Sequence, residues 1–92
     1  MNVHGFQVPE DAIDAAWEFM RAGGTFDCKV LAKVIGRWFR FDKATMSREG
    51  HTTVCQDAAH RLVREARADL ELVRRGFRNE HHHYRWRSRP QK

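Results

Sequence analysis

The sequence of 92 residues lacks the features that mark several common classes of protein. Its only cysteines, Cys28 and Cys55, have neither the spacing of a zinc site nor the density of a disulfide-stabilised domain. No apolar run approaches the length of a membrane span, and the first eight residues are too polar for a signal peptide. We therefore expect a cytoplasmic protein without membrane contact, whose two thiols are buried and free.

Motifs of catalysis are missing as well. There is no glycine-rich phosphate loop, no HExxH pair and no nucleophile elbow. Cys55, Asp57 and His60 are close in sequence, but the apolar pattern turns Cys55 inward, away from His60. The run His81–His83 places only two histidines on one face of a strand, too few for a metal site. The sequence thus predicts no enzyme and no metal or other cofactor.

Positive charge is what the chain has in excess, and its distribution is uneven. The formal net charge is +5, yet residues 1–20 carry four acidic side chains and no Lys or Arg. Residues 61–92 carry ten Lys and Arg against four acidic side chains. A field of this kind attracts a polyanion, and the same charge also serves as a plain solubilising surface. Composition alone leaves both interpretations open.

The first half of the chain predicts two helices within a single domain, 1–92. Residues 1–7 and 88–92 are expected to be frayed tails. Pro9 and the acids that follow it begin one helix, which ends at Gly23-Gly24. Thr25-Phe26 is short and extended. Asp27 then caps a second helix, and residues 40–51 are expected to form a loop.

The second half predicts a third helix and a hairpin. Thr53 and Gln56 have the spacing of a capping box, and an apolar stripe continues from Val54 to Ala66. Two alternating segments, 70–75 and 81–87, follow on either side of a turn that contains Gly76 and Asn79.

The order helix, short strand, helix, helix, strand, turn, strand resembles the winged helix-turn-helix family. The residues that carry the resemblance are Gly24-Thr25-Phe26-Asp27, Ala58-Ala59-His60-Arg61-Leu62-Val63, Arg74-Arg75-Gly76 and Tyr84-Arg85-Trp86. The resemblance implies an α+β, mainly helical fold with three helices and a C-terminal β-hairpin wing. It also implies a small basic DNA-binding protein, a transcriptional regulator. The loop of about a dozen residues is a departure, either an insertion or an extra turn at Ala44–Ser47.

By resemblance, the third helix would enter the major groove of duplex DNA and the wing would contact its backbone. The implied DNA-contacting residues are Thr52, Thr53, Gln56, Asp57, His60, Arg61 and Arg64 on the helix, and Arg74, Arg75 and Arg78 on the wing. Gln56, His60 and Arg64 share one stripe, and Gln and Arg make bidentate contacts with adenine and guanine edges. By charge alone, phosphate suits Arg61, Arg67 and the wing arginines. Asp57 is the exception, since a carboxylate repels phosphate.

The aromatic residues suggest a second possible function. Phe39 and Phe41 follow the second helix, and Phe77 falls in the predicted turn. Exposed together, such side chains form a protein-docking patch. The alternative is therefore a small adaptor or inhibitor, phage- or mobile-element-like, that binds a host protein or self-associates.

Overall fold

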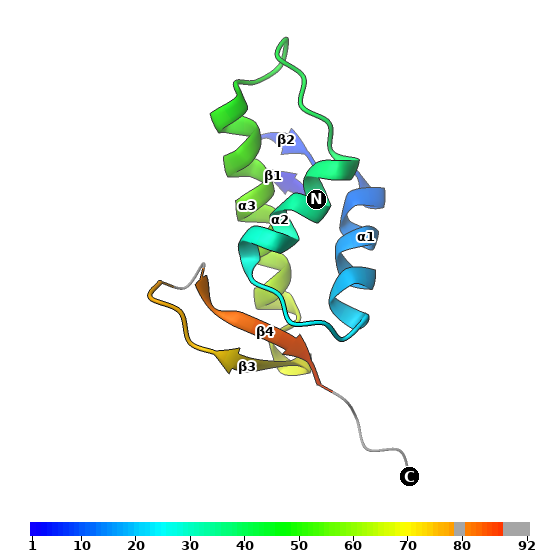
Figure 1. The fold of residues 1–92 in the computed structure, drawn as a ribbon. Helices are drawn as coiled ribbons and strands as arrows, with labels where there is room; N and C mark the ends of the chain where they lie inside the picture. The colour runs from blue at the N-terminus through cyan, green and yellow to red at the C-terminus, as the bar shows by residue number, and fades with distance from the viewer. Residues whose placement is uncertain (79–80, 88–92) are drawn as a thin grey trace.

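The computed structural model describes residues 1–78 and 81–87 and contains three helices and two small antiparallel hairpins (Figure 1). The elements in chain order are β1 (Asn2–Val3), β2 (Phe6–Gln7), α1 (Glu10–Arg21), α2 (Cys28–Trp38), α3 (Arg48–Glu65), a 3-10 turn (Arg67–Asp69), β3 (Leu70–Arg74) and β4 (His83–Trp86). The predicted α+β, mainly helical fold with a C-terminal hairpin is confirmed. The predicted tail at 88–92 lies outside the described residues. Within the described part, no helix combines the length and apolar character needed to cross a membrane.

Local signals explain where the first two helices begin and end. Glu10 and Asp11 lie in the first turn of α1, where the helix dipole favours negative charge. The helix ends at Ala22, and Gly23 adopts a φ of +92° that glycine tolerates without strain. Asp27 caps α2 as predicted, because its Oδ1 accepts a hydrogen bond of 2.8 Å from the backbone N–H of Val30.

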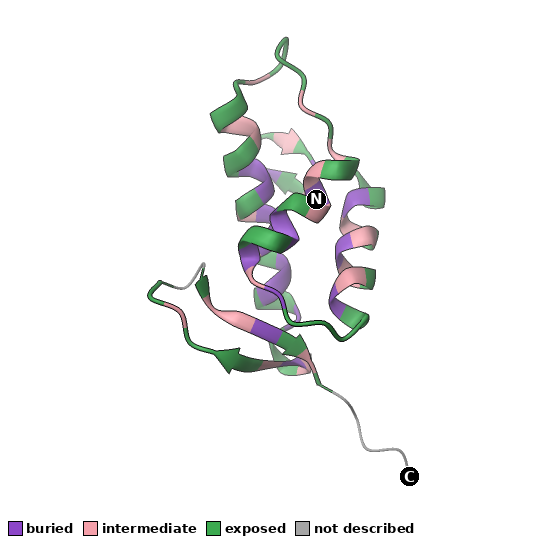
Figure 2. Ribbon diagram, in the orientation of Figure 1, coloured by how far each residue is buried: buried purple, intermediate pink, exposed green. Residues whose placement is uncertain are grey.

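The core lies where the inner faces of the three helices meet, as the buried stripes in Figure 2 show. The largest fully buried side chains are Phe26, Met20, Leu31, Ile35, Leu62, Val8 and Val54. Cys28 and Cys55 are buried free thiols, as the sequence predicted. The apolar stripe predicted from Val54 to Ala66 therefore identified the side of α3 that faces the core.

The C-terminal hairpin is anchored to the helical core by a third extended segment. In the β3–β4 ladder, Leu70 pairs with Trp86 and Leu72 with Tyr84, and the register shifts between Leu72 and Arg74. Phe26 bridges Tyr84 on the other side of β4: its N–H donates to Tyr84 O at 2.9 Å, and Tyr84 N–H donates to Phe26 O at 2.7 Å. The predicted short strand before α2 thus exists as this bridge, and it holds the start of α2 beside the hairpin.

The prediction that residues 1–7 fray is wrong. β1 and β2 pair through a two-residue turn in which His4 has a φ of 53° and Gly5 a φ of 83°, the geometry of a type I′ hairpin turn. Val3 is only 2% exposed and belongs to the core cluster. The hairpin closes because the N–H of Val8 donates to Met1 O at 2.8 Å. Burial of Val3 and Val8 offsets the entropy of ordering a short segment.

The prediction that Thr53 caps the third helix is also wrong. α3 begins at Arg48, and the hydroxyl of Ser47 accepts a hydrogen bond of 3.0 Å from Gly50 N–H. The ring of His51 explains the earlier start, because it stacks on Phe39 at 5.1 Å between centroids and hydrogen-bonds to Phe39 O at 2.6 Å. These contacts hold residues 48–51 in the helix although Gly50 disfavours it.

The connection between α2 and α3 is correspondingly shorter than predicted and spans residues 39–47. It contains a turn in which the N–H groups of Thr45 and Met46 both donate to Asp42 O at 3.1 Å. The extra turn expected at Ala44–Ser47 is present and starts at Asp42.

Candidate nucleic-acid interface

A basic groove runs along the junction of α3 with the hairpin. It consists of three hollows of about 170, 180 and 310 Å³, and each shares lining residues with the next. Its polar lining residues are Lys29, Gln56, His60, Arg64, Arg67, Arg75, His81, His82 and Arg87. Among the described residues that line it, five are Lys or Arg and none is Asp or Glu. The described lining of the groove therefore gathers positive charge and includes no carboxylate.

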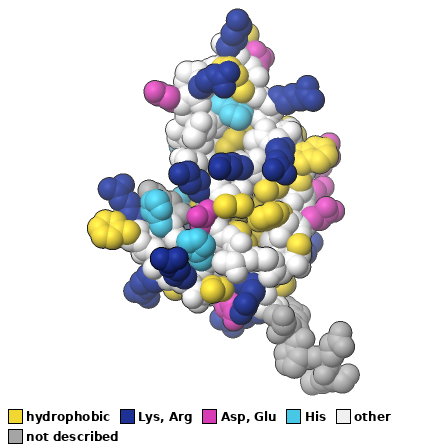
Figure 3. Space-filling view, in the orientation of Figure 1, with side chains coloured by type: hydrophobic (Ala, Val, Ile, Leu, Met, Phe, Trp, Pro, Cys, Tyr) yellow, Lys and Arg dark blue, Asp and Glu magenta, His cyan; other side chains and the backbone are white. Residues whose placement is uncertain are grey.

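Three elements bring these side chains together. α3 supplies Gln56, His60 and Arg64 from successive turns, and the hairpin supplies His81 and His82. α2 supplies Lys29 from its first turn. Figure 3 shows Lys and Arg side chains spread over α2 and around the hairpin, with His side chains among them. The cationic surface is thus not a property of α3 alone.

The stripe predicted on the third helix is one side of this groove. Gln56 and Arg64 are exposed and His60 is half-buried, and all three line the groove. Thr53 is exposed but lines none of the described hollows. Thr52 lines a neighbouring hollow between α2 and α3, which shares Lys29 and Gln56 with the groove. The four-residue spacing therefore correctly identified side chains that share a surface.

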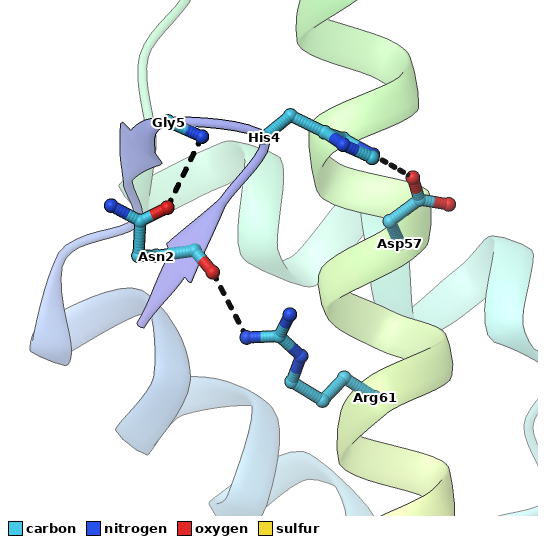
Figure 4. Close-up of polar contacts among 5 residues, drawn as sticks. All are labelled: Asn2, His4, Gly5, Asp57 and Arg61. Carbon is cyan, nitrogen blue, oxygen red and sulfur yellow. Dashed lines mark hydrogen bonds and ion pairs between the residues drawn. The ribbon is translucent and has the colours of Figure 1, made fainter.

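The opposite flank of α3 is engaged by the N-terminal hairpin (Figure 4). Nε2 of His4 makes a short contact with Oδ2 of Asp57, and Arg61 donates a hydrogen bond of 2.9 Å to the backbone oxygen of Asn2. Asp57 and Arg61 thus belong to an intramolecular contact. The structure separates them from Gln56, His60 and Arg64, with which the sequence had grouped them.

The wing arginines take three different positions. Arg75 lines the groove. Arg74 is exposed at the end of β3 and pairs in register with His83. Arg78 is exposed in the turn, where its carbonyl oxygen accepts a hydrogen bond of 2.9 Å from the N–H of His81. On the outer side of the ladder, Arg85 Nε donates to Glu71 Oε1 at 2.7 Å, so this arginine is already paired across the strands.

The three consecutive histidines have separate surroundings. His81 lines the groove together with His60. His82 accepts a hydrogen bond of 2.9 Å at Nδ1 from Gly76 N–H. His83 lies with its Nε2 3.8 Å from Oδ2 of Asp27. Each of the three therefore has a different neighbour, and in the described residues no group of three or more His, Cys, Asp or Glu is arranged to hold a metal ion.

Sequence analysis did not foresee Lys29 and Arg87 as groove residues. Lys29 is exposed in the first turn of α2. It reaches the groove because the bridge between Phe26 and Tyr84 sets the start of α2 against the hairpin. Arg87 follows β4, and its Nε donates to Leu70 O at 3.2 Å across the ladder. The predicted extended segment Thr25-Phe26 suggested that the start of α2, and with it Lys29, lies beside a strand. The sequence did not show which strand this is.

Cys55, which lines the hollow between α2 and α3, is chemically quiet. Burial raises the pKa of Cys55 from 9.0 to about 11, so the reactive thiolate is scarce near neutral pH. His51 Nε2 lies 3.8 Å from Cys55 Sγ, but that ring nitrogen already bonds to Phe39 O at 2.6 Å. The pair packs the end of α2 against α3 and offers no activated nucleophile.

Comparison with protein-family models, with curated protein sequences and with solved structures finds no match to this chain.

Proposed function

We propose that this chain is a small duplex-DNA-binding protein, of the transcriptional-regulator type. In this proposal α3 lies in the major groove and the hairpin contacts the backbone beside it. The observation that carries the proposal is the basic groove, where Lys29, Arg64, Arg67, Arg75 and Arg87 converge and no described acid intervenes. A concave surface of this kind suits a regularly spaced polyanion better than a compact ligand.

The groove offers both kinds of contact that a DNA reader needs. Arg67 and Arg75 carry fixed positive charge suited to phosphate oxygens. Gln56 and Arg64 project from α3 on the same stripe. The amide of Gln56 offers a donor and an acceptor for an adenine edge, and the guanidinium of Arg64 offers two donors for a guanine edge. Asp57, whose carboxylate would repel phosphate, is paired with His4 on the flank. That carboxylate therefore lies away from the proposed reading face.

Salt dependence of binding tests this proposal. If four or five groove cations each neutralise a phosphate, the logarithm of the affinity should fall against the logarithm of salt concentration with a slope of about −4. The measurement is fluorescence anisotropy of a labelled duplex titrated with the protein at several salt concentrations. Absence of binding at low salt would refute the proposal.

Single substitutions distinguish residues that contact the DNA backbone from residues that read base edges. Arg75→Ala should weaken binding to every duplex and make the slope shallower by about one unit. Gln56→Ala should cost roughly 1–3 kcal/mol on a preferred site selected from a random pool, with little change on random duplex. Arg40→Ala is the matched control, because this exposed arginine lies in the 39–47 connection, far from the hairpin (Figure 1). An effect of Arg40→Ala as large as that of Arg75→Ala would move the functional surface to that connection.

The second candidate function is a protein adaptor or inhibitor, and one observation favours it. Leu72, Val73 and Phe77 are large apolar side chains exposed on the hairpin, and Trp38 is exposed at the end of α2. A stoichiometric protein partner captured by the purified chain, together with no duplex binding at low salt, would support this function over DNA binding.

A further inference from the structure

The tip of the C-terminal hairpin presents one aromatic ring to solvent. Phe77 is 99% exposed, the highest value among the large hydrophobic side chains of the described residues. Hydrophobic atoms also stand out at the hairpin tip in Figure 3, beside basic and His side chains. A phenyl ring left outside every core contact contributes nothing to folding, so its position calls for a partner that buries it.

The backbone on both sides of Phe77 is anchored. Gly76 N–H donates to Nδ1 of His82 at 2.9 Å, and the N–H of His81 donates to Arg78 O at 2.9 Å. Gly76 also packs directly on the returning strand, since a Cβ built at Gly76 would lie 2.3 Å from His81 O. Any side chain at Gly76 would push these backbones apart. Phe77 therefore lies between two anchored backbone positions, Gly76 and Arg78, with its ring in solvent.

The surroundings of the ring indicate the kind of partner. Arg75 and Arg78 flank Phe77 in the turn, and Arg74 ends the strand that leads to it. An apolar protein pocket would have to desolvate these guanidinium groups next to the ring. Stacked bases edged by phosphates accept both the ring and the cations, because an apolar wedge enters between base pairs while arginines contact the minor groove and backbone.

We propose that Phe77 is a wedge that inserts from the minor groove between adjacent base pairs of duplex DNA. This inference rests on the proposed DNA binding and adds how the wing engages the duplex. Insertion of an apolar side chain partly unstacks a base step and kinks the duplex. The wing would then deform DNA in addition to contacting its backbone.

Relaxation of a closed circular plasmid by a type I topoisomerase tests the wedge without knowledge of a preferred site. Protein is bound, the plasmid is relaxed, the protein is removed and the change in linking number is read on a gel. Wild-type protein should lower the linking number in proportion to the amount bound. Phe77→Ala should lose this shift while still retarding a linear duplex, and Phe77→Leu, which keeps an apolar wedge, should retain part of it.

Val73→Ala is the matched control, because Val73 is an exposed apolar residue of β3 that is 45% exposed and away from the tip. It should leave the linking-number shift unchanged. Equal shifts for wild type and Phe77→Ala, with duplex binding intact, would overturn the wedge and leave DNA binding standing. Failure of the wild type to retard duplex at low salt would instead overturn both, and burial of Phe77 against a protein would then be the better explanation.

Discussion

Truncation of Val3 to Ala should destabilise the protein as a core substitution does, although Val3 is the third residue of the chain. Its side chain is 2% exposed and packs in the same cluster as Val8 and the helices. The change removes two methyl groups, each contributing about 0.8 kcal/mol of burial, and leaves a small cavity. We expect the free energy of unfolding to fall by about 2–3 kcal/mol.

Val30 supplies the matched control. The same Val→Ala change at Val30 removes the same atoms from a side chain that is 40% exposed on α2. Its free energy of unfolding should fall by less than about 1 kcal/mol, because the side chain is already partly exposed and Ala favours the helix. The difference between the two variants isolates burial of the N-terminal hairpin from the chemistry of the substitution.

Urea unfolding followed by tryptophan fluorescence measures the effect. Trp17 and Trp86 pack edge to face with centroids 6.2 Å apart, on α1 and β4, so their signal reports global unfolding at a site distant in sequence from Val3. Thermal midpoints should agree, with about 4–8 °C lost per kcal/mol in a domain of this size. Equal stabilities of Val3→Ala and Val30→Ala would refute the docked hairpin and restore the frayed tail that the sequence suggested.

Two further predictions concern the third helix. Ser47→Ala should lower the free energy of unfolding by about 1 kcal/mol because it removes the observed cap, whereas Thr53→Ala should not lower it, since Thr53 is an exposed position inside α3; urea midpoints compare the two, and the reverse order would return the cap to Thr53. Burial raises the pKa of Cys55 from 9.0 to about 11, so the folded state holds the thiol proton more tightly than the unfolded chain. Stability should therefore fall as pH rises from about 9 to 11, and Cys55→Ala should flatten that fall when unfolding is measured across this range; an identical slope in both proteins would contradict the assigned burial effect.

Periodicity predicted the parts of the fold whose elements are long enough to bury a continuous stripe. α1 and α2 were located from apolar spacing and from local signals such as Asp27, which caps α2 as expected. The N-terminal hairpin was not predicted because each of its strands has two residues, too few to show an alternating apolar pattern. Its turn carries His4 at a positive φ where Asn or Asp is the usual signal.

The start of α3 was predicted wrongly for a different reason. Gly50 and the charged residues around it read locally as a loop, and only a tertiary contact decides otherwise. His51 is fixed between Phe39, on which it stacks, and Phe41, whose ring meets it edge-on at 5.8 Å between centroids. Such pairings join residues a dozen positions apart and leave no trace in a helical pattern. Local propensity is then overridden by packing.

In the candidate site, spacing along one helix predicted which of its side chains share a surface, but not which other elements join them. Spacing placed Gln56, His60 and Arg64 together, and the groove contains all three. Which neighbours join them depends on the elements packed on either side of α3. On one flank the bridge of Phe26 to Tyr84 brings the start of α2 and the hairpin against the stripe, adding cations that no helical period could predict.

On the other flank the N-terminal hairpin contacts Asp57 through His4 and Arg61 through Asn2. An unpaired carboxylate on that helix would oppose phosphate binding, but Asp57 is paired with His4. Arg61 gives its hydrogen bond to Asn2 O and sits beside that pair, away from the groove. Asp57 and Arg61 thus lie together on the flank away from the groove, and no described lining residue of the basic groove is an acid. The short hairpin at the start of the chain therefore helps determine which side of α3 is suited to a polyanion.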